Sequence, residues 1–157
     1  MTISRILALL ASVAWLGIGQ AAAEDLRDVD ALTFRSFDLN NDGKISRREH
    51  IRFSDLASLS MDANNDETLS IEEFLMWGIG YAHFGIQAGK TAAVEEAKRQ
   101  VYGSCDLNKD GKLHGDEFSV CSLYDFYRAD LDRDGALNQA EFIQEFRIIV
   151  ALRAPLH

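Results

Sequence analysis

Four segments of the chain place carboxylate and amide oxygens at the same intervals. Each segment begins with Asp, has Asn or Asp at position 3 and Asp at position 5, and ends with Glu at position 12. The segments are residues 38–49, 62–73, 106–117 and 130–141, called here the first to fourth loops. Such hard oxygen ligands suit Ca²⁺, which takes about six to eight of them at once. The pattern therefore predicts up to four calcium-binding loops.

The loops resemble the calcium-binding loop of the EF-hand superfamily, and this resemblance implies ligands at positions 1, 3, 5, 7, 9 and 12, with position 7 contributing its backbone carbonyl. In the third loop position 9 is His114, and we expect a water molecule to bind there instead of the imidazole. The ligand sets are Asp38, Asn40, Asp42, Lys44, Ser46 and Glu49; Asp62, Asn64, Asp66, Thr68, Ser70 and Glu73; Asp106, Asn108, Asp110, Lys112 and Glu117; and Asp130, Asp132, Asp134, Ala136, Asn138 and Glu141.

The resemblance to the EF-hand superfamily covers residues 34–146. It implies an all-α fold of helix–loop–helix units, or hands, whose loops pair through short antiparallel β contacts. The spacing is more similar to that of compact four-loop EF-hand proteins exported by bacteria than to that of calmodulin.

The four loops are not equivalent. The fourth carries four acidic ligands and is predicted to bind most tightly, while the second has Glu67 at position 6, where a turn with positive φ favours Gly. We expect residues 62–73 to form the weakest calcium site. A vestigial loop that only supports its partner is the alternative.

The loops recur as two copies of a two-loop unit. Asp38 and Asp62 are 24 residues apart, as are Asp106 and Asp130, and the two copies are offset by 68 residues. The predicted organisation is a first pair of hands in 24–80, a connecting segment with an entering helix in 81–104, and a second pair with a C-terminal helix in 105–157.

Pairing within each copy would place Ile45 against Leu69 and Leu113 against Leu137, all at position 8 of their loops. Between loops there is room for two short helices that meet near Ser54, which is the preferred interpretation, or for one shared helix.

Apolar residues around the loops follow the helical period and are predicted to form the core. The aromatic members are Phe34, Phe37, Phe53, Phe74, Trp77, Tyr102, Phe118, Phe126, Phe142 and Phe146. Two apolar stretches leave alternatives open. The middle segment 74–104 either packs the two halves together or forms a groove for a partner, and the run 142–152 is buried between the halves or in a dimer contact.

The N-terminus has the pattern of a secretory signal peptide. A basic residue, Arg5, precedes an apolar run over 6–18, and small residues end at Ala23. We expect cleavage after residue 23, a periplasmic or secreted protein, and no membrane span in the remaining chain; an uncleaved N-terminal anchor is the alternative.

The remaining chain is strongly acidic. Loss of residues 1–23, whose one charged side chain is Arg5, changes the formal charge from −9 to −10. Thirteen of the acidic side chains are at ligand positions, where bound calcium would neutralise them. Without a basic tract to offset this charge, nucleic acid is a poor partner.

Cys105 and Cys121 are the two cysteines, and in an exported protein they are predicted to form a disulfide. They flank the third loop at positions that Phe37 and Phe53 occupy around the first loop. Two reduced core thiols are the alternative.

Three functional classes remain for such a chain. An enzyme is disfavoured because the histidines, serines and glycines show no catalytic or nucleotide-binding spacing. A calcium buffer or calcium-stabilised module needs only the loops and a core. A calcium-dependent sensor or adaptor also needs an apolar groove for a protein partner, which is often rich in Met. The predicted mature chain has only Met61 and Met76, which favours the buffer or module.

Overall fold

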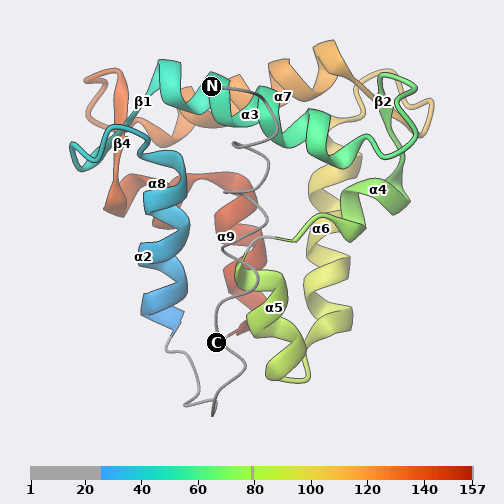
Figure 1. Cartoon of the computed structure of the whole chain (residues 1–157), viewed down its shortest axis with the longest axis horizontal. Coiled ribbons are helices and arrows are strands. Elements are labelled where there is room, and N and C mark those ends of the chain that lie inside the picture. The colour runs from blue at the N-terminus through green and yellow to red at the C-terminus, as the bar shows by residue number, and fades with distance from the viewer. Residues whose placement is uncertain (1–25, 79, 157) are drawn as a thin grey trace.

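The computed structural model describes residues 26–78 and 80–156 of the 157-residue chain (Figure 1). The predicted signal peptide, residues 1–23, lies outside the described residues. Within the described ranges, no helix combines the length and the apolar character needed to cross a membrane.

The described chain folds into helices connected by loops and two short antiparallel strand pairs, which confirms the predicted all-α fold. The elements are α2 Leu26–Phe37, β1 Lys44–Ser46, α3 Arg47–Met61, β2 Thr68–Leu69, α4 Ile71–Met76, α5 Gly80–Gln87, α6 Thr91–Cys105, β3 Leu113–His114, α7 Gly115–Ala129, β4 Ala136–Asn138, α8 Gln139–Glu145, α9 Arg147–Arg153 and the 3₁₀ turn η1 Ala154–Leu156.

The two loops of each half share one helix, so the preferred prediction of two short helices meeting near Ser54 is wrong. Helix α3 runs without a break from the first loop to the second, and α7 does the same between the third and fourth. Residues 47–61 contain no Gly or Pro that would end a helix. Ser46 caps α3 in a reciprocal capping box with Glu49, and Ser54 instead contacts Ser122 of α7.

The loops pair between the two halves of the chain, not within them. Strand β1 pairs with β4, which places Ile45 opposite Leu137, and β2 pairs with β3, which places Leu69 opposite Leu113. The predicted contacts of Ile45 with Leu69 and of Leu113 with Leu137 are therefore wrong. A shared helix of 15 residues spans roughly 22 Å, so it holds the two loops of one half at opposite ends.

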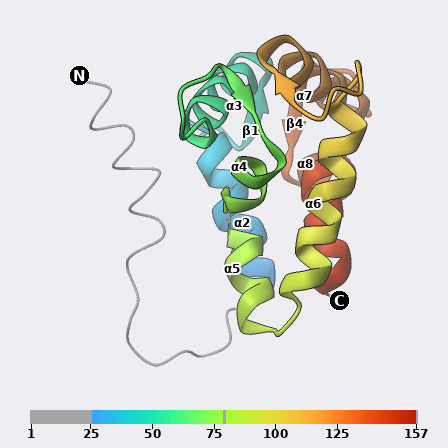
Figure 2. The ribbon, with the colours of Figure 1, turned by 90° about the vertical axis from the view of Figure 1, so that its right-hand side faces the viewer.

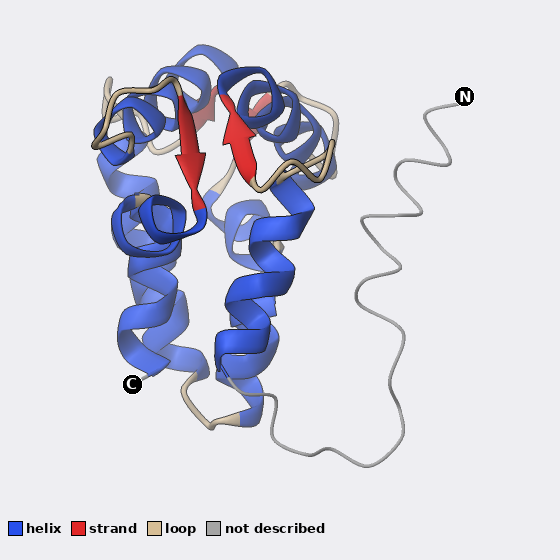
Figure 3. Ribbon diagram, turned by 90° about the vertical axis from the view of Figure 1, so that its left-hand side faces the viewer, coloured by secondary structure: helices blue, strands red, loops and turns tan. Residues whose placement is uncertain are grey.

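Helices α3 and α7 lie side by side and form what we call the α3–α7 layer (Figures 1 and 2). The His50 ring nitrogen Nε2 lies 3.1 Å from the carbonyl oxygen of Ser122, to which it donates. Because the two helices are antiparallel, the first loop meets the fourth at one end of the layer, and the second meets the third at the other. Figure 3 shows the strands at these loop contacts.

The core lies beneath the α3–α7 layer, where the other helices converge. The rings of Phe37 and Phe53 stack with centroids 3.6 Å apart, and those of Phe142 and Phe146 stack at 5.5 Å. Of the aromatic residues predicted for the core, eight are buried, while Trp77 and Phe118 are partly buried against it. The core prediction is thus confirmed.

A buried polar cluster joins three distant helices. Asp30 of α2 accepts hydrogen bonds from the Arg153 guanidinium of α9, at 2.8 and 3.0 Å, and from the Tyr81 hydroxyl of α5, at 2.7 Å. Tyr81, Ile149 and Leu152 are almost completely buried. The middle segment and the C-terminal run therefore both pack inside the chain and hold its two halves together.

The predicted disulfide between Cys105 and Cys121 is present, with their Cα atoms 5.4 Å apart. Cys105 is the last residue of α6 and Cys121 lies in the second turn of α7, so the bridge ties together the two helices that flank the third loop.

Reduction of this disulfide is expected to lower the free energy of unfolding by about 3 kcal/mol, because the bridge restricts the unfolded chain over a loop of 16 residues. Urea unfolding of the oxidised and reduced protein measures the change without altering any side chain. A Cys105→Ala/Cys121→Ala variant, which should not respond to reductant, is the control. Coincident unfolding curves for the oxidised and reduced wild-type protein would contradict the prediction.

Candidate metal centres

Each loop turns sharply at the same two positions. Position 4 is left-handed in all loops, with φ between 57° and 63°, and so is position 6, with φ of 85° or 86° at Gly43, Gly111 and Gly135. At position 6 of the second loop, Glu67 adopts φ 65°. The sequence thus predicted correctly that a side chain here must occupy a backbone region that favours Gly.

The aspartate at position 1 organises the turn around its carboxylate. In the first loop, Asp38 accepts from the amide of Asp42 at 3.1 Å and from that of Gly43 at 2.9 Å. In the fourth, Asp130 accepts from the amides of Asp134 and Gly135, both at 3.1 Å. These bonds fold the first and fourth loops around the aspartates at their position 1.

The glutamate at position 12 connects both ends of its loop. Glu141 Oε1 accepts from the amides of Leu131 and Asp132, and Oε2 accepts from the amide of Asn138. Glu49, Glu73 and Glu117 make the corresponding bonds in the other loops. The helix that follows each loop therefore carries the predicted bidentate ligand back to the start of the loop.

Hydrogen bonds keep several of these carboxyl groups ionised. The backbone amide and hydroxyl of Ser70 lower the pKa of Glu73, and the amides of Asn108 and His114 lower that of Glu117. The Thr68 hydroxyl and amide lower the pKa of Asp66 to about 2. At neutral pH these groups are carboxylates, which is the form that binds calcium.

Two features of the structure fit a bound cation. One carboxylate oxygen from each of Asp130, Asp132 and Asp134 lies within 4.8 Å of the others. In the third loop, Oδ1 of Asp106 is buried and has no hydrogen-bond partner among the described residues. An unpaired buried carboxylate oxygen is unfavourable, and a hard cation would supply the missing interaction. The residues present therefore suit Ca²⁺, which would be held by the predicted ligands.

The second loop is the most exposed of the four. Asp62 and Glu73 are half-buried, whereas the residues at positions 1 and 12 of the other loops are buried. This difference adds to the left-handed Glu67 and supports the prediction that calcium binds most weakly here.

Replacing Glu67 by Gly is expected to tighten calcium binding at the second loop about fivefold, because it removes roughly 1 kcal/mol of backbone strain. Calorimetric titration of the wild-type and Glu67→Gly proteins tests this. Glu67→Gln removes the same charge but keeps the strained side chain, so it should leave the affinity near the wild-type value. If Glu67→Gln tightens binding as much as Glu67→Gly does, charge and not turn geometry is responsible.

Three side chains that join paired loops were missed by the sequence reasoning. The Tyr102 hydroxyl donates to the carbonyls of Leu69 at 2.7 Å and Gly111 at 2.9 Å, which lie in the second and third loops. Lys44 and Lys112, predicted only as carbonyl ligands, reach aspartates of the loops opposite. The sequence did contain a signal for Tyr102. It lies four residues before its loop, where the first and fourth loops are preceded by Phe34 and Phe126, which have no hydroxyl group.

Comparison with known families identifies two of the four hands. The family model described as EF hand matches residues 29–54 and 123–146, which contain the first and fourth loops. These two loops are the ones that pair through β1 and β4. No curated protein matches the chain. The two matched segments and the all-α fold support membership of the EF-hand superfamily and indicate calcium binding.

Proposed function

We propose that this protein is an exported, non-enzymatic calcium-binding protein that acts as a calcium buffer or calcium-stabilised module. The observation that carries the proposal is the sharing of α3 and α7, each of which leaves one loop and enters the next. A sensor hand opens when its two helices change their angle. Here such a movement in one hand would displace the neighbouring hand and the loop paired with it.

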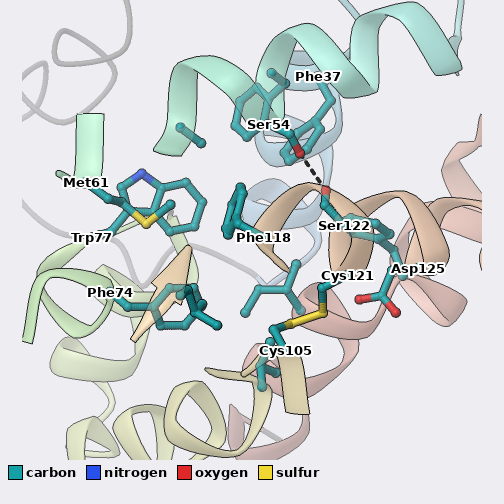
Figure 4. A pocket seen from close by; sticks show the side chains of 16 residues that line it. Phe37, Ser54, Met61, Phe74, Trp77, Cys105, Phe118, Cys121, Ser122 and Asp125 are labelled. Carbon is teal, nitrogen blue, oxygen red and sulfur yellow. Dashed lines mark hydrogen bonds between the residues drawn. A yellow bond between two sulfur atoms is a disulfide. The ribbon is translucent and has the colours of Figure 1, made fainter. Parts of the chain in front are cut away.

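Further contacts oppose opening. The disulfide joins α6 to α7, and the buried cluster around Asp30 joins α2 to α5 and α9. An apolar cavity between α3, α4, α6 and α7 has a volume of about 70 Å³ and is lined by residues such as Phe74, Trp77 and Phe118 (Figure 4). Ligand pockets usually measure about 300–1,000 Å³. The cavity is thus far smaller than a groove that takes a partner helix.

The N-terminal pattern in residues 1–23 supports export. Outside the cytosol, even EF-hand sites with dissociation constants of about 10⁻⁴–10⁻³ M can be occupied. A permanently loaded protein fits that setting better than a switch. If export is correct, the protein recovered from the periplasm or the medium should have the mass of residues 24–157.

Fluorescence of an apolar dye with calcium and with chelator tests the proposed role. The buffer or module predicts little dye binding in calcium and no calcium-dependent increase. A large increase on adding calcium would instead identify a sensor whose apolar surface opens for a protein partner. Magnesium at the same ionic strength controls for charge screening.

A further inference from the structure

Each pair of loops is crossed by one lysine side chain. The Lys44 ammonium, at position 7 of the first loop, contacts Oδ2 of Asp134 in the fourth. Lys112, at position 7 of the third loop, lies 3.4 Å from Oδ2 of Asp66 in the second. In both pairs, a lysine at position 7 of one loop therefore contacts the carboxylate at position 5 of the loop paired with it. Position 7 of the second and fourth loops is Thr68 and Ala136, which are uncharged, so no equivalent ion pair forms in the opposite direction.

The lysines contact the carboxylate oxygen that the turn leaves available. Oδ1 of Asp134 accepts from the amide of Ala136 at 2.9 Å, and Oδ1 of Asp66 accepts from the amide of Thr68 at 3.0 Å. These bonds hold Oδ1 within its own loop. Oδ2 is therefore the oxygen that remains for an external cation, and at Asp66 it also accepts from the side-chain amide of Asn64.

We propose that Lys44 and Lys112 are built-in counter-cations that compete with calcium for the fourth and second loops. This inference rests on the proposed calcium binding. In the metal-free protein each ammonium offsets part of the repulsion among clustered carboxylates. When calcium enters, the ammonium must leave the carboxylate or remain beside a divalent cation, and both alternatives weaken binding. Because Lys44 also offers its carbonyl to the first loop, one residue serves both loops of a pair.

The Lys44 contact changes the expected order of calcium affinity among the loops. Ligand charge alone predicts the highest calcium affinity for the fourth loop. Lys44, from the first loop, offsets part of that charge by its contact with Asp134. About half of each lysine side chain is exposed, so the effect is expected to be modest. We expect the loss of either ammonium to tighten the opposite loop about two- to fivefold.

Backbone amides allow each loop to be followed separately by NMR. The Gly135 amide donates to Asp130 of the fourth loop at 3.1 Å, and the Glu67 amide donates to Asp62 of the second at 3.0 Å. In Lys44→Gln the Gly135 signal should titrate at two- to fivefold lower calcium, while the Glu67 signal keeps its midpoint. Lys112→Gln should give the reverse pattern.

Lys109→Gln is the matched control, because it removes the same charge from a lysine that contacts the Gly103 carbonyl instead of a ligand. It should leave the Gly135 midpoint unchanged. A second measurement separates competition from general damage: Lys44→Gln should melt at a lower temperature than the wild type without metal, although it binds calcium more tightly. Weaker or unchanged binding at the fourth loop would overturn the inference. If no loop amide of the wild-type protein responds to calcium, the proposed function itself fails and the inference falls with it.

Discussion

Removal of calcium is expected to lower the free energy of unfolding by about 2.7 kcal/mol for each loop occupied at a free calcium concentration 100 times its dissociation constant, or about 11 kcal/mol for four loops. The stabilisation arises because the unfolded chain does not assemble the ligands. In all four loops the glutamate at position 12 accepts a hydrogen bond from the backbone amide at position 2 or 3, so the folded chain already holds the two ends of each loop together. Thermal or urea unfolding in calcium and in chelator measures the difference.

The same experiment counts the bound ions. Above saturation, the free energy of unfolding rises with the logarithm of free calcium in proportion to the number of ions released. A slope that corresponds to four ions would show that the second loop binds calcium, and a slope that corresponds to three would identify that loop as vestigial. Magnesium is the control for ionic strength. Identical unfolding curves in calcium and in chelator would contradict calcium binding by the folded protein.

Substitution of Asp30 by Asn is expected to cost about 3–5 kcal/mol of stability, because it leaves the Arg153 guanidinium without its carboxylate. Both carboxylate oxygens of Asp30 accept from Arg153, and one also accepts from Tyr81. Burial raises the pKa of the Tyr81 hydroxyl, which therefore stays protonated and donates. An Asn side chain keeps one acceptor oxygen and turns an NH₂ group toward Arg153.

Asp28→Asn provides the matched control. Asp28 lies on the same helix two residues earlier and is exposed, so loss of its charge should change stability by less than about 0.5 kcal/mol. Urea unfolding of both variants is measured in excess calcium, so that the calcium sites are equally occupied and the difference in stability reports the Asp30 cluster alone. Equal stability of the two variants would show that the Asp30 cluster contributes no more than a surface charge.

The local sequence was sufficient to predict the left-handed turn at Glu67, the aromatic core and the disulfide. The left-handed conformation of Glu67 follows from its place at position 6, and the bridge follows from cysteines at two inward-facing positions beside one loop. These features depend on residues close together in the chain, or on a periodicity that shows which side faces inward. The identity of the calcium ligands remains a prediction of the same kind.

Pairing of the loops could not be predicted in this way. Ile45, Leu69, Leu113 and Leu137 are similar apolar residues, so any two of them would make an acceptable β contact. The choice depends on the continuous helix between the two loops of each half, α3 or α7, which keeps those two loops apart. The interval between loops was compatible with either one helix or two, and without a Gly or Pro to break it the single helix forms. The contacts of Lys44 and Tyr102 across the pairs were missed for the same reason.

The exchange of loops between halves also bears on how the chain folds. The Lys44–Asp134 and Lys112–Asp66 contacts join residues 90 and 46 positions apart, so neither loop pair can form until most of the chain has been synthesised. The two pairs are related as the contacts of an isologous dimer are, with the first loop of each half meeting the second loop of the other. A single half would therefore present both of its loops unpaired. It would gain the missing contacts only by association with another half, so the natural unit of cooperative folding is both copies of the two-loop unit together.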